Sequence, residues 1–159
     1  MKSLQRYLNT AKRLQKNDPI VSYYCLYYAA QLGLLLRSQN PKEQEAEKQF
    51  LVNLMDMMEQ ERESLGDKLG LNDEDYVKNY VMNFYKVCLE KEKMGKADKY
   101  LARDFLTVWT LFEVYSQFVE DYPKDMEEMK NNARMKAVSL SISIQAQDTE
   151  EPNSVNASV

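Results

Sequence analysis

The sequence offers little for catalysis, because none of its 159 residues is a histidine. Without histidine the chain lacks the most common general base, the usual partner of a nucleophilic serine or cysteine, and the most common transition-metal ligand. Carboxylate pairs one helical turn apart, Glu43/Glu47 and Glu59/Glu63, are typical of solvated helix faces, and no glycine-rich phosphate loop is present. We therefore expect no enzymatic activity, no metal and no cofactor.

Cysteine usage and charge narrow the class of protein further. Cys25 and Cys88 lie in apolar stretches without metal-ligand spacing, which favours two buried free thiols in a reducing compartment. Charged residues make up 29 % of the chain, with a net charge of −4, and they are mixed along its length. The concentrated basic face typical of nucleic-acid binding is therefore absent. We recognise no secretory signal and no apolar run long enough to cross a bilayer, so we expect neither nucleic-acid binding nor direct membrane insertion.

Helix is the expected structure almost throughout, because only 4 glycines and 4 prolines interrupt the chain. The clearest start is at Asp18, a good N-cap residue, followed by Pro19 at the first helical position. The apolar spacing predicts six helices, over about residues 2–16, 19–39, 41–65, 73–94, 97–122 and 123–144. Their order and short connections predict an all-α fold of two antiparallel three-helix bundles packed in tandem, residues 1–66 and 67–145, followed by a disordered tail at 146–159.

Two of the predicted helices carry patterns that suggest a binding surface. The helix that begins at Pro19 is apolar on nearly all sides and has four tyrosines within six residues, which suits a helix half in a core and half at a surface that meets another molecule. The next helix combines a wide apolar band with acidic residues. We predict a groove between the two that takes an amphipathic helix of another protein. The predicted contact residues are Tyr24, Tyr27, Leu51, Met55, Asp56, Met58, Glu59 and Arg62.

Both patterns have a simpler interpretation. The tyrosines would then pack only against neighbouring helices, and the apolar band would be a broad core stripe beside an ordinary solvated face. In the fourth predicted helix, apolar or aromatic residues recur at every fourth position, at Tyr76, Tyr80, Phe84 and Cys88.

The residues from 17 to 25, Asn-Asp-Pro-Ile-Val-Ser-Tyr-Tyr-Cys, resemble a signature of the LYST-interacting protein / Vta family of vacuolar protein sorting adaptors. Further segments resemble the family in the same order, at Ala11-Lys12 and at residues 50–56, 92–96, 105–107 and 113–118. The resemblance covers roughly residues 4–144, the extent of the family's N-terminal domain. The chain departs from the family pattern at residues 132–137, where a tryptophan is usual, and at residues 40–48, which lengthen the start of the third helix.

The resemblance implies two MIT-type three-helix modules that bind the C-terminal tails of ESCRT-III subunits, the charged multivesicular body proteins. It implies a cytoplasmic protein, peripheral on endosomal membranes. In the family a separate C-terminal domain dimerises and stimulates the AAA ATPase that disassembles ESCRT-III. Nothing like that domain is recognised in these 159 residues, so contact with the ATPase is expected only through a domain absent here. The alternatives are a structural or oligomerisation bundle, and the related N-terminal domain of a large glucan synthase.

Overall fold

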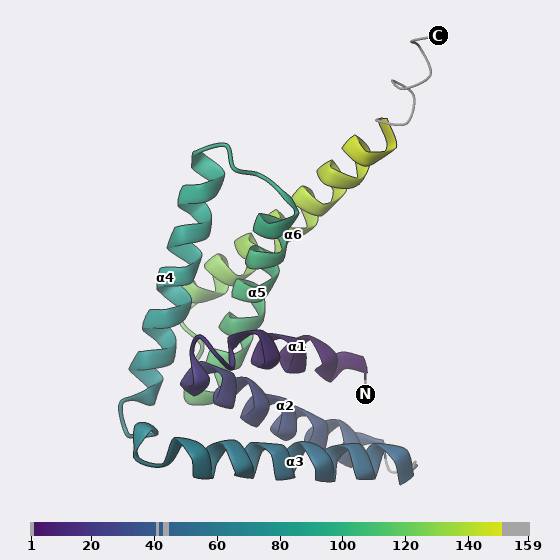
Figure 1. Ribbon diagram of the computed structural model, residues 1–159, viewed down its shortest axis with the longest axis vertical. Helices are drawn as coiled ribbons and strands as arrows, with labels where there is room; N and C mark the ends of the chain where they lie inside the picture. The colour runs from purple at the N-terminus through teal and green to yellow at the C-terminus, as the bar shows by residue number, and fades with distance from the viewer. Residues whose placement is uncertain (1, 41, 43–44, 151–159) are drawn as a thin grey trace. The chain divides into compact units, whose positions relative to one another are not determined.

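The computed structural model describes residues 2–40, 42 and 45–150, which form helices joined by short connections (Figure 1). The α-helices are α1 (Gln5–Leu14), α2 (Pro19–Gln39), α3 (Glu45–Leu65), α4 (Asp73–Lys93), α5 (Lys99–Tyr115) and α6 (Lys124–Glu150). Short 3-10 turns precede α1 at Lys2–Leu4 and follow α3 at Gly66–Lys68 and α5 at Ser116–Phe118. No strand occurs among these described residues, so the all-α prediction is confirmed.

The chain divides into two compact units. Unit 1 consists of Met1–Tyr80 with Val114–Glu120, and unit 2 of Val81–Glu113 with Asp121–Val159. The start of α4 thus belongs to unit 1 and the remainder to unit 2. The predicted modules, divided at residue 66, stay a prediction. The predicted tail begins at residue 146, but α6 continues to Glu150, and residues 151–159 lie outside the described part.

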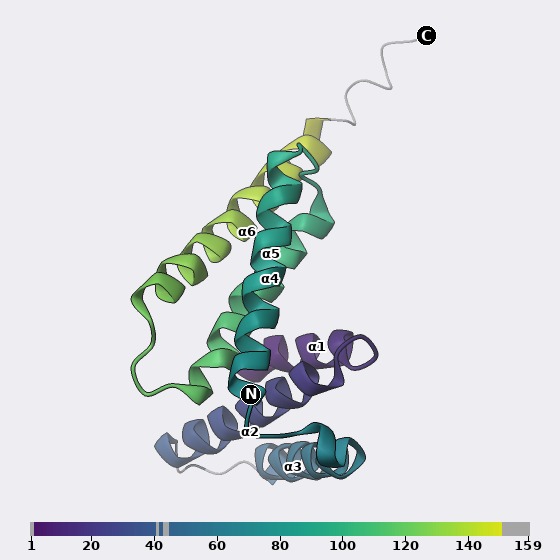
Figure 2. The same cartoon turned by 90° about the vertical axis from the view of Figure 1, so that its left-hand side faces the viewer.

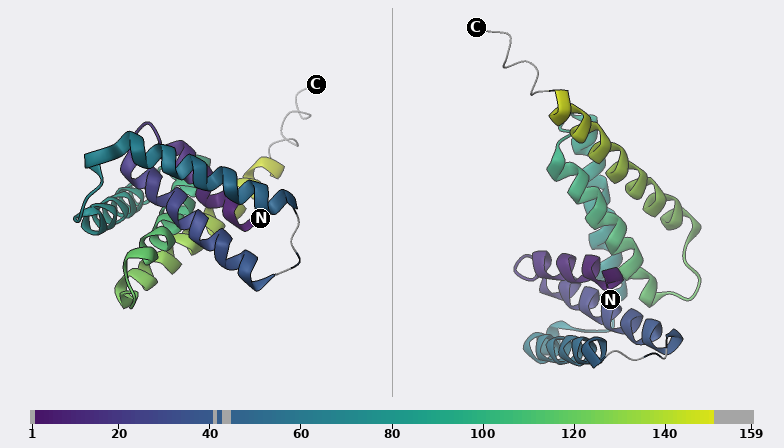
Figure 3. Two further views of the ribbon diagram at one scale, coloured as in Figure 1. Left: turned by 90° about the horizontal axis from the view of Figure 1, so that it is seen from below. Right: turned by 90° about the vertical axis from the view of Figure 1, so that its right-hand side faces the viewer.

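Helix α2 forms the centre of unit 1, with α1 on one flank and α3 on the other (Figures 1 and 3). Its start is as predicted: the Asp18 carboxylate accepts a hydrogen bond from the Val21 backbone nitrogen at 3.2 Å, and Pro19 occupies the first turn. Because it packs on both flanks, α2 buries residues on more than one side between Val21 and Gly33, whereas Leu34 and Leu35 near its end are exposed. By length and composition alone α2 is also apolar enough to cross a membrane, contrary to the expectation from the sequence; its buried residues from Val21 to Gly33 account for part of that apolarity.

The closest approach in this packing occurs at Gly33 of α2. A Cβ atom added there would lie 2.4 Å from Leu51 Cδ2 and 3.0 Å from Leu4 Cδ1. The missing side chain therefore allows the 3-10 turn before α1 and helix α3 to approach α2 closely at this position, and any larger residue would force the neighbouring leucines to move.

We expect Gly33→Val to destabilise the protein by about 2 kcal/mol, because overpacking a filled core displaces side chains from their rotamers. Thermal unfolding followed by circular dichroism measures the effect. Gly70→Val is the matched control, since a Cβ at Gly70 meets nothing within 4 Å. Equal melting temperatures for the two variants would show that the packing around Gly33 can accommodate a larger side chain.

The structure corrects two expectations about the later helices. The fully buried residues of α4 are Val77, Val81, Tyr85 and Cys88, whereas of the other residues predicted at every fourth position Tyr80 and Phe84 are half-buried and Tyr76 is exposed. Tyr76 instead lies at the edge, where its hydroxyl donates to Asp18 Oδ2 at 2.7 Å. Helix α5 ends at Tyr115 rather than Tyr122, because the next residues form a 3-10 turn and Val119 is extended.

Unit 2 has its own core, built where α4, α5 and α6 lie alongside one another (Figure 2). Phe105 and Phe112 of α5 are fully buried, and the Tyr85 ring meets Phe112 edge-on with centroids 5.8 Å apart. The Tyr85 hydroxyl accepts a hydrogen bond from Asn132 Nδ2 at 2.5 Å. The two cysteines are buried and free, as predicted.

Candidate interaction surfaces of the first unit

The four tyrosines of α2 have different environments, and only part of this cluster faces outward. Tyr23 is buried, and Tyr28 meets the Tyr7 ring of α1 edge-on with centroids 4.9 Å apart. Tyr27 is exposed and Tyr24 is half-buried. Both interpretations of the tyrosine-rich helix therefore describe some of its residues: two tyrosines serve the packing, and the two predicted as contact residues reach the surface.

Two aspartates and two tyrosines join the start of α2 to the start of α4 within unit 1. The Tyr24 hydroxyl donates to Asp73 Oδ2 at 2.5 Å, and the Gly70 backbone nitrogen donates to the same oxygen at 3.0 Å. In the opposite direction, the Tyr76 hydroxyl of α4 donates to Asp18, the residue that caps α2. We call these contacts the crossed aspartate–tyrosine pairs.

The tyrosine hydroxyls of these pairs remain protonated far above neutral pH. Burial and the hydrogen bond to Asp73 raise the pKa of Tyr24 strongly. The hydrogen bond to Asp18, with a smaller effect of burial, raises the pKa of Tyr76 to about 12. Both groups therefore act as fixed donors rather than as charges, and they hold the chain between α3 and α4 in place.

Beside Tyr24 lies a pocket of about 530 Å³ that we call the tyrosine pocket. The Phe118 ring meets the Tyr24 ring edge-on at 4.8 Å, and Gln117 Nε2 donates to the Tyr24 carbonyl oxygen at 3.1 Å. The residues lining it are Tyr23, Tyr24, Tyr27, Gln31, Arg62, Leu69, Gly70, Gln117 and Phe118. Three of the predicted contact residues, Tyr24, Tyr27 and Arg62, are thus brought together.

The predicted contact residues of α3 separate into two groups. Leu51 and Met58 are buried and belong to the core stripe, whereas Met55, Asp56 and Glu59 are exposed. Glu59 and Arg62 lie one turn apart on this exposed side, with 3.8 Å between Glu59 Oε1 and Arg62 Nη1. The wide apolar band therefore consists of a core stripe and a separate outward-facing row, and only the outward row can contact a partner in this conformation.

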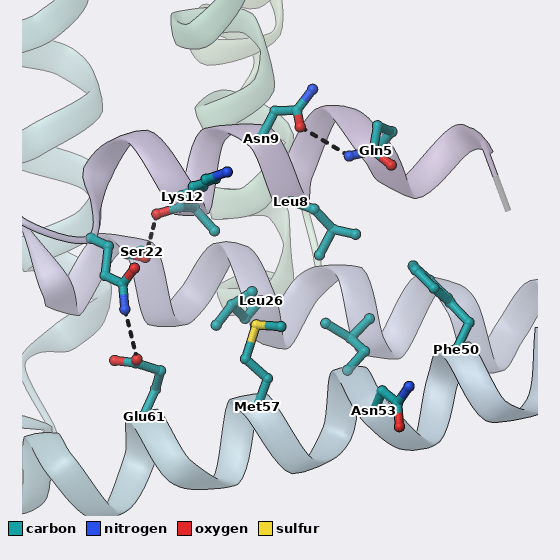
Figure 4. Close-up of a pocket in the computed structure, with 13 residues that line it drawn as sticks. Gln5, Leu8, Asn9, Lys12, Ser22, Leu26, Phe50, Asn53, Met57 and Glu61 are labelled. Atoms are coloured by element: carbon teal, nitrogen blue, oxygen red, sulfur yellow. Dashed lines mark hydrogen bonds between the residues drawn. The ribbon is translucent and has the colours of Figure 1, made fainter.

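A second hollow, not predicted from the sequence, is lined by side chains of α1, α2 and α3 and has a volume of about 610 Å³ (Figure 4). Gln15 Nε2 bridges it at one end by donating to Glu61 Oε1 at 3.0 Å. Its apolar lining comes from Leu8, Ala11, Leu26, Phe50, Leu54 and Met57, and its polar lining from Gln5, Asn9, Lys12, Gln15, Ser22, Asn53 and Glu61. The signal in the sequence was Met57, which lies outside the core stripe of α3 and is 50 % exposed.

Comparisons with known proteins relate this chain to proteins named for vacuolar protein sorting. Residues 3–146 match the Vta1-like family. The human vacuolar protein sorting-associated protein VTA1 homolog is 31 % identical over 140 residues, which cover 86 % of this chain and 44 % of the human protein. The Arabidopsis thaliana protein named homolog of mammalian LYST-interacting protein 5 is 30 % identical over 140 residues, covering 87 % of this chain and 32 % of that protein.

A more distant relative, putative callose synthase 6 of Arabidopsis thaliana, is 24 % identical over 125 residues, which cover 79 % of this chain and 6 % of the synthase. In each comparison the chain spans less than half the length of the relative it matches. The family match, by contrast, extends over nearly the whole chain and includes every segment on which the resemblance in the sequence rests. The chain therefore belongs to the Vta1-like family.

Proposed function

We propose that this chain acts in vacuolar protein sorting, in the ESCRT pathway, as a non-catalytic adaptor. In this role it binds C-terminal tail helices of ESCRT-III subunits in the cytoplasm, at the surface of endosomal membranes. The observation that carries the proposal is the outward row of α3, where Met55 is 39 % exposed beside the carboxylates of Asp56 and Glu59. The residues of this row do not contribute to the core, to which α3 contributes Leu51 and Met58 instead.

The docking surface proposed for the tail runs from the tyrosine pocket along α3. Met55, Glu59 and Arg62 share one face of α3, because their spacing of four and three residues follows the helical repeat. Arg62 and Tyr27 line the tyrosine pocket together, so this face continues onto α2. A tail helix would place aliphatic side chains against Tyr27 and Met55, and basic side chains next to Asp56 and Glu59.

The test is Met55→Asp in the 159-residue chain, with fluorescence anisotropy against a panel of ESCRT-III C-terminal peptides. A single docked helix is expected to bind at the micromolar level, about −8 kcal/mol. A carboxylate placed against its aliphatic anchors should cost at least about 2 kcal/mol, which is roughly a thirtyfold loss of affinity. Thermal unfolding should be nearly unchanged, because Met55 is already partly in water.

Met57→Asp is the matched control, because Met57 is similarly exposed but lines the hollow between α1 and α3. We expect this variant to bind the peptides like the unaltered chain. Weaker binding by Met57→Asp together with normal binding by Met55→Asp would indicate that the tail binds in the hollow between α1 and α3, and would refute the proposed surface. Binding of no peptide in the panel would refute the function itself.

A further inference from the structure

The tyrosine pocket of unit 1 contains a buried side chain whose polar atom is unused. Tyr23 is 6 % exposed, and its ring meets the Tyr24 ring edge-on with centroids 5.1 Å apart. Among the described residues the Tyr23 hydroxyl has no hydrogen-bond partner, yet it is not sealed from solvent. Because Tyr23 lines the pocket, this hydroxyl is open to it. A buried residue with a free polar atom at a hollow indicates a place where a ligand can supply the missing partner.

The other polar side chains at this pocket are also free to donate hydrogen bonds. The Tyr27 hydroxyl and the Gln31 amide form no hydrogen bond with another described residue. The ion pair of Arg62 with Glu59 spans 3.8 Å between Nη1 and Oε1, which is too long for a hydrogen bond. Arg62 is the single charged residue among the described residues that line the pocket. The pocket therefore offers hydroxyl, amide and guanidinium donors around one positive charge.

The acceptors close to this pocket are engaged or closed to a ligand. Asp73 does not line the pocket, and it accepts hydrogen bonds from the Tyr24 hydroxyl and the Gly70 backbone nitrogen. The side-chain nitrogen of Gln117 donates to the carbonyl oxygens of Tyr24 and Val114, and Gln117 Oε1 is sealed from solvent. A ligand in the pocket would thus find more donors than acceptors.

The Tyr23 hydroxyl is a donor at neutral pH. Burial raises the pKa of Tyr23, and this effect is larger than the opposite effect of the nearby Arg62 charge. A carboxylate matches this arrangement, because it carries a negative charge and accepts through both oxygens. Arg62 would repel a cation, and a neutral amide would leave the guanidinium charge without a partner.

From this set of donors we infer that the tyrosine pocket takes one carboxylate, the side chain of an aspartate or glutamate in the bound tail. The inference rests on the proposed function, which supplies the tail, and adds the residue that the tail presents at this end of the surface. Arg62 pairs with the carboxylate, and the Tyr23 hydroxyl donates to it from the buried side. Because Asp56 attracts basic residues elsewhere on α3, the acidic and basic residues of the tail together set its direction.

The first experiment needs no tail. Sodium acetate is titrated into the isotope-labelled 159-residue chain, and NMR follows the Arg62 Nε–H and Gln31 side-chain amide signals. We expect both signals to shift and to saturate in roughly the millimolar range, whereas acetamide, which has the same size and no charge, leaves them unchanged. Tyr23→Phe keeps the ring and removes the donor, so it should weaken acetate binding roughly tenfold. Tyr28→Phe, the same substitution on α2 outside the pocket, is the control and should bind acetate normally.

The second experiment measures the tail by fluorescence anisotropy. In the ESCRT-III peptide that binds the 159-residue chain most tightly, each aspartate is replaced in turn by asparagine and each glutamate by glutamine. We expect one of these replacements to weaken binding to the unaltered chain about tenfold, and to have little effect on binding to the double variant Tyr23→Phe/Arg62→Gln. Amidation of the peptide's C-terminus should leave its affinity unchanged.

These measurements separate failure of the inference from failure of the proposed function. Acetate that shifts neither the Arg62 nor the Gln31 signal would overturn the inference, whether or not a tail binds. Tail binding that is indifferent to every acidic replacement would also overturn it and leave the proposed function intact. A loss of affinity on amidation alone would assign the pocket to the terminal carboxylate and overturn the assignment to a side chain. A chain that binds acetate here but no peptide would support the carboxylate chemistry of the pocket and refute only the proposed function.

Discussion

Replacing Leu51 by aspartate is expected to unfold unit 1, whereas replacing the adjacent Val52 by aspartate is expected to leave it folded. Leu51 is 2 % exposed and lies against Gly33 of α2, while Val52 is 43 % exposed. Leu51→Asp loses a buried side chain and leaves a carboxylate without a partner, which together cost at least about 4 kcal/mol. That is much of the total stability of about 5–15 kcal/mol that domains have.

Circular dichroism at increasing temperature measures the result in both variants. Val52→Asp is a close control, since the substitution and the helix are the same and only the direction of the side chain differs. The comparison also bears on the binding surface, because Leu51 was among the predicted contact residues. A Leu51→Asp variant that melts normally and binds tail peptides weakly would mean that Leu51 faces a partner and that the core of α3 is misassigned.

In unit 2 the largest expected effect belongs to Phe105. Phe105→Ala removes a fully buried ring and should destabilise the unit by about 3–5 kcal/mol. Leu106→Ala, next to it in α5, should cost less than about 1 kcal/mol because Leu106 is partly exposed. Trp109, the single tryptophan of the chain, lies in unit 2. Its fluorescence during urea unfolding therefore reports this unit directly.

A similar urea midpoint for both variants would contradict the burial of Phe105. It would also contradict the orientation of α5, in which Phe105 is buried and Leu106 is partly exposed. The same pair of variants therefore tests the orientation of α5 without any ligand.

Local signals in the sequence predicted a helix boundary well where one or two residues determine it. The α2 start at Asp18 and Pro19 follows from capping and the fixed φ of proline. The end of α5 could not be predicted in this way, because residues 116–118 leave the helix where Gln117 and Phe118 contact Tyr24, far away in the sequence. On α4 the spacing placed Tyr76 in line with Tyr80, Phe84 and Cys88, and only the tertiary structure shows Tyr76 donating to Asp18.

The candidate site was predictable only in part, because the direction of a side chain depends on tertiary packing. Composition identified α2 and α3 as the helices with more apolar surface than a core needs. It could not say which side of α3 points outward, since Leu51 and Met55 have similar chemistry and differ only in direction. The hollow between α1 and α3 was missed because its polar lining, Gln5, Asn9 and Asn53, looks like any solvated face until the helices are set around α2.

The crossed aspartate–tyrosine pairs have a consequence for the entropy of binding. They connect residues 49 and 58 positions apart, and the chain between them contains the whole of α3. Closing that loop is part of folding, so the free protein has already restricted the motion of α3 before any partner arrives. A tail helix that docks on α3 would then meet an ordered surface, and the ordering cost of complex formation would fall mainly on the tail itself.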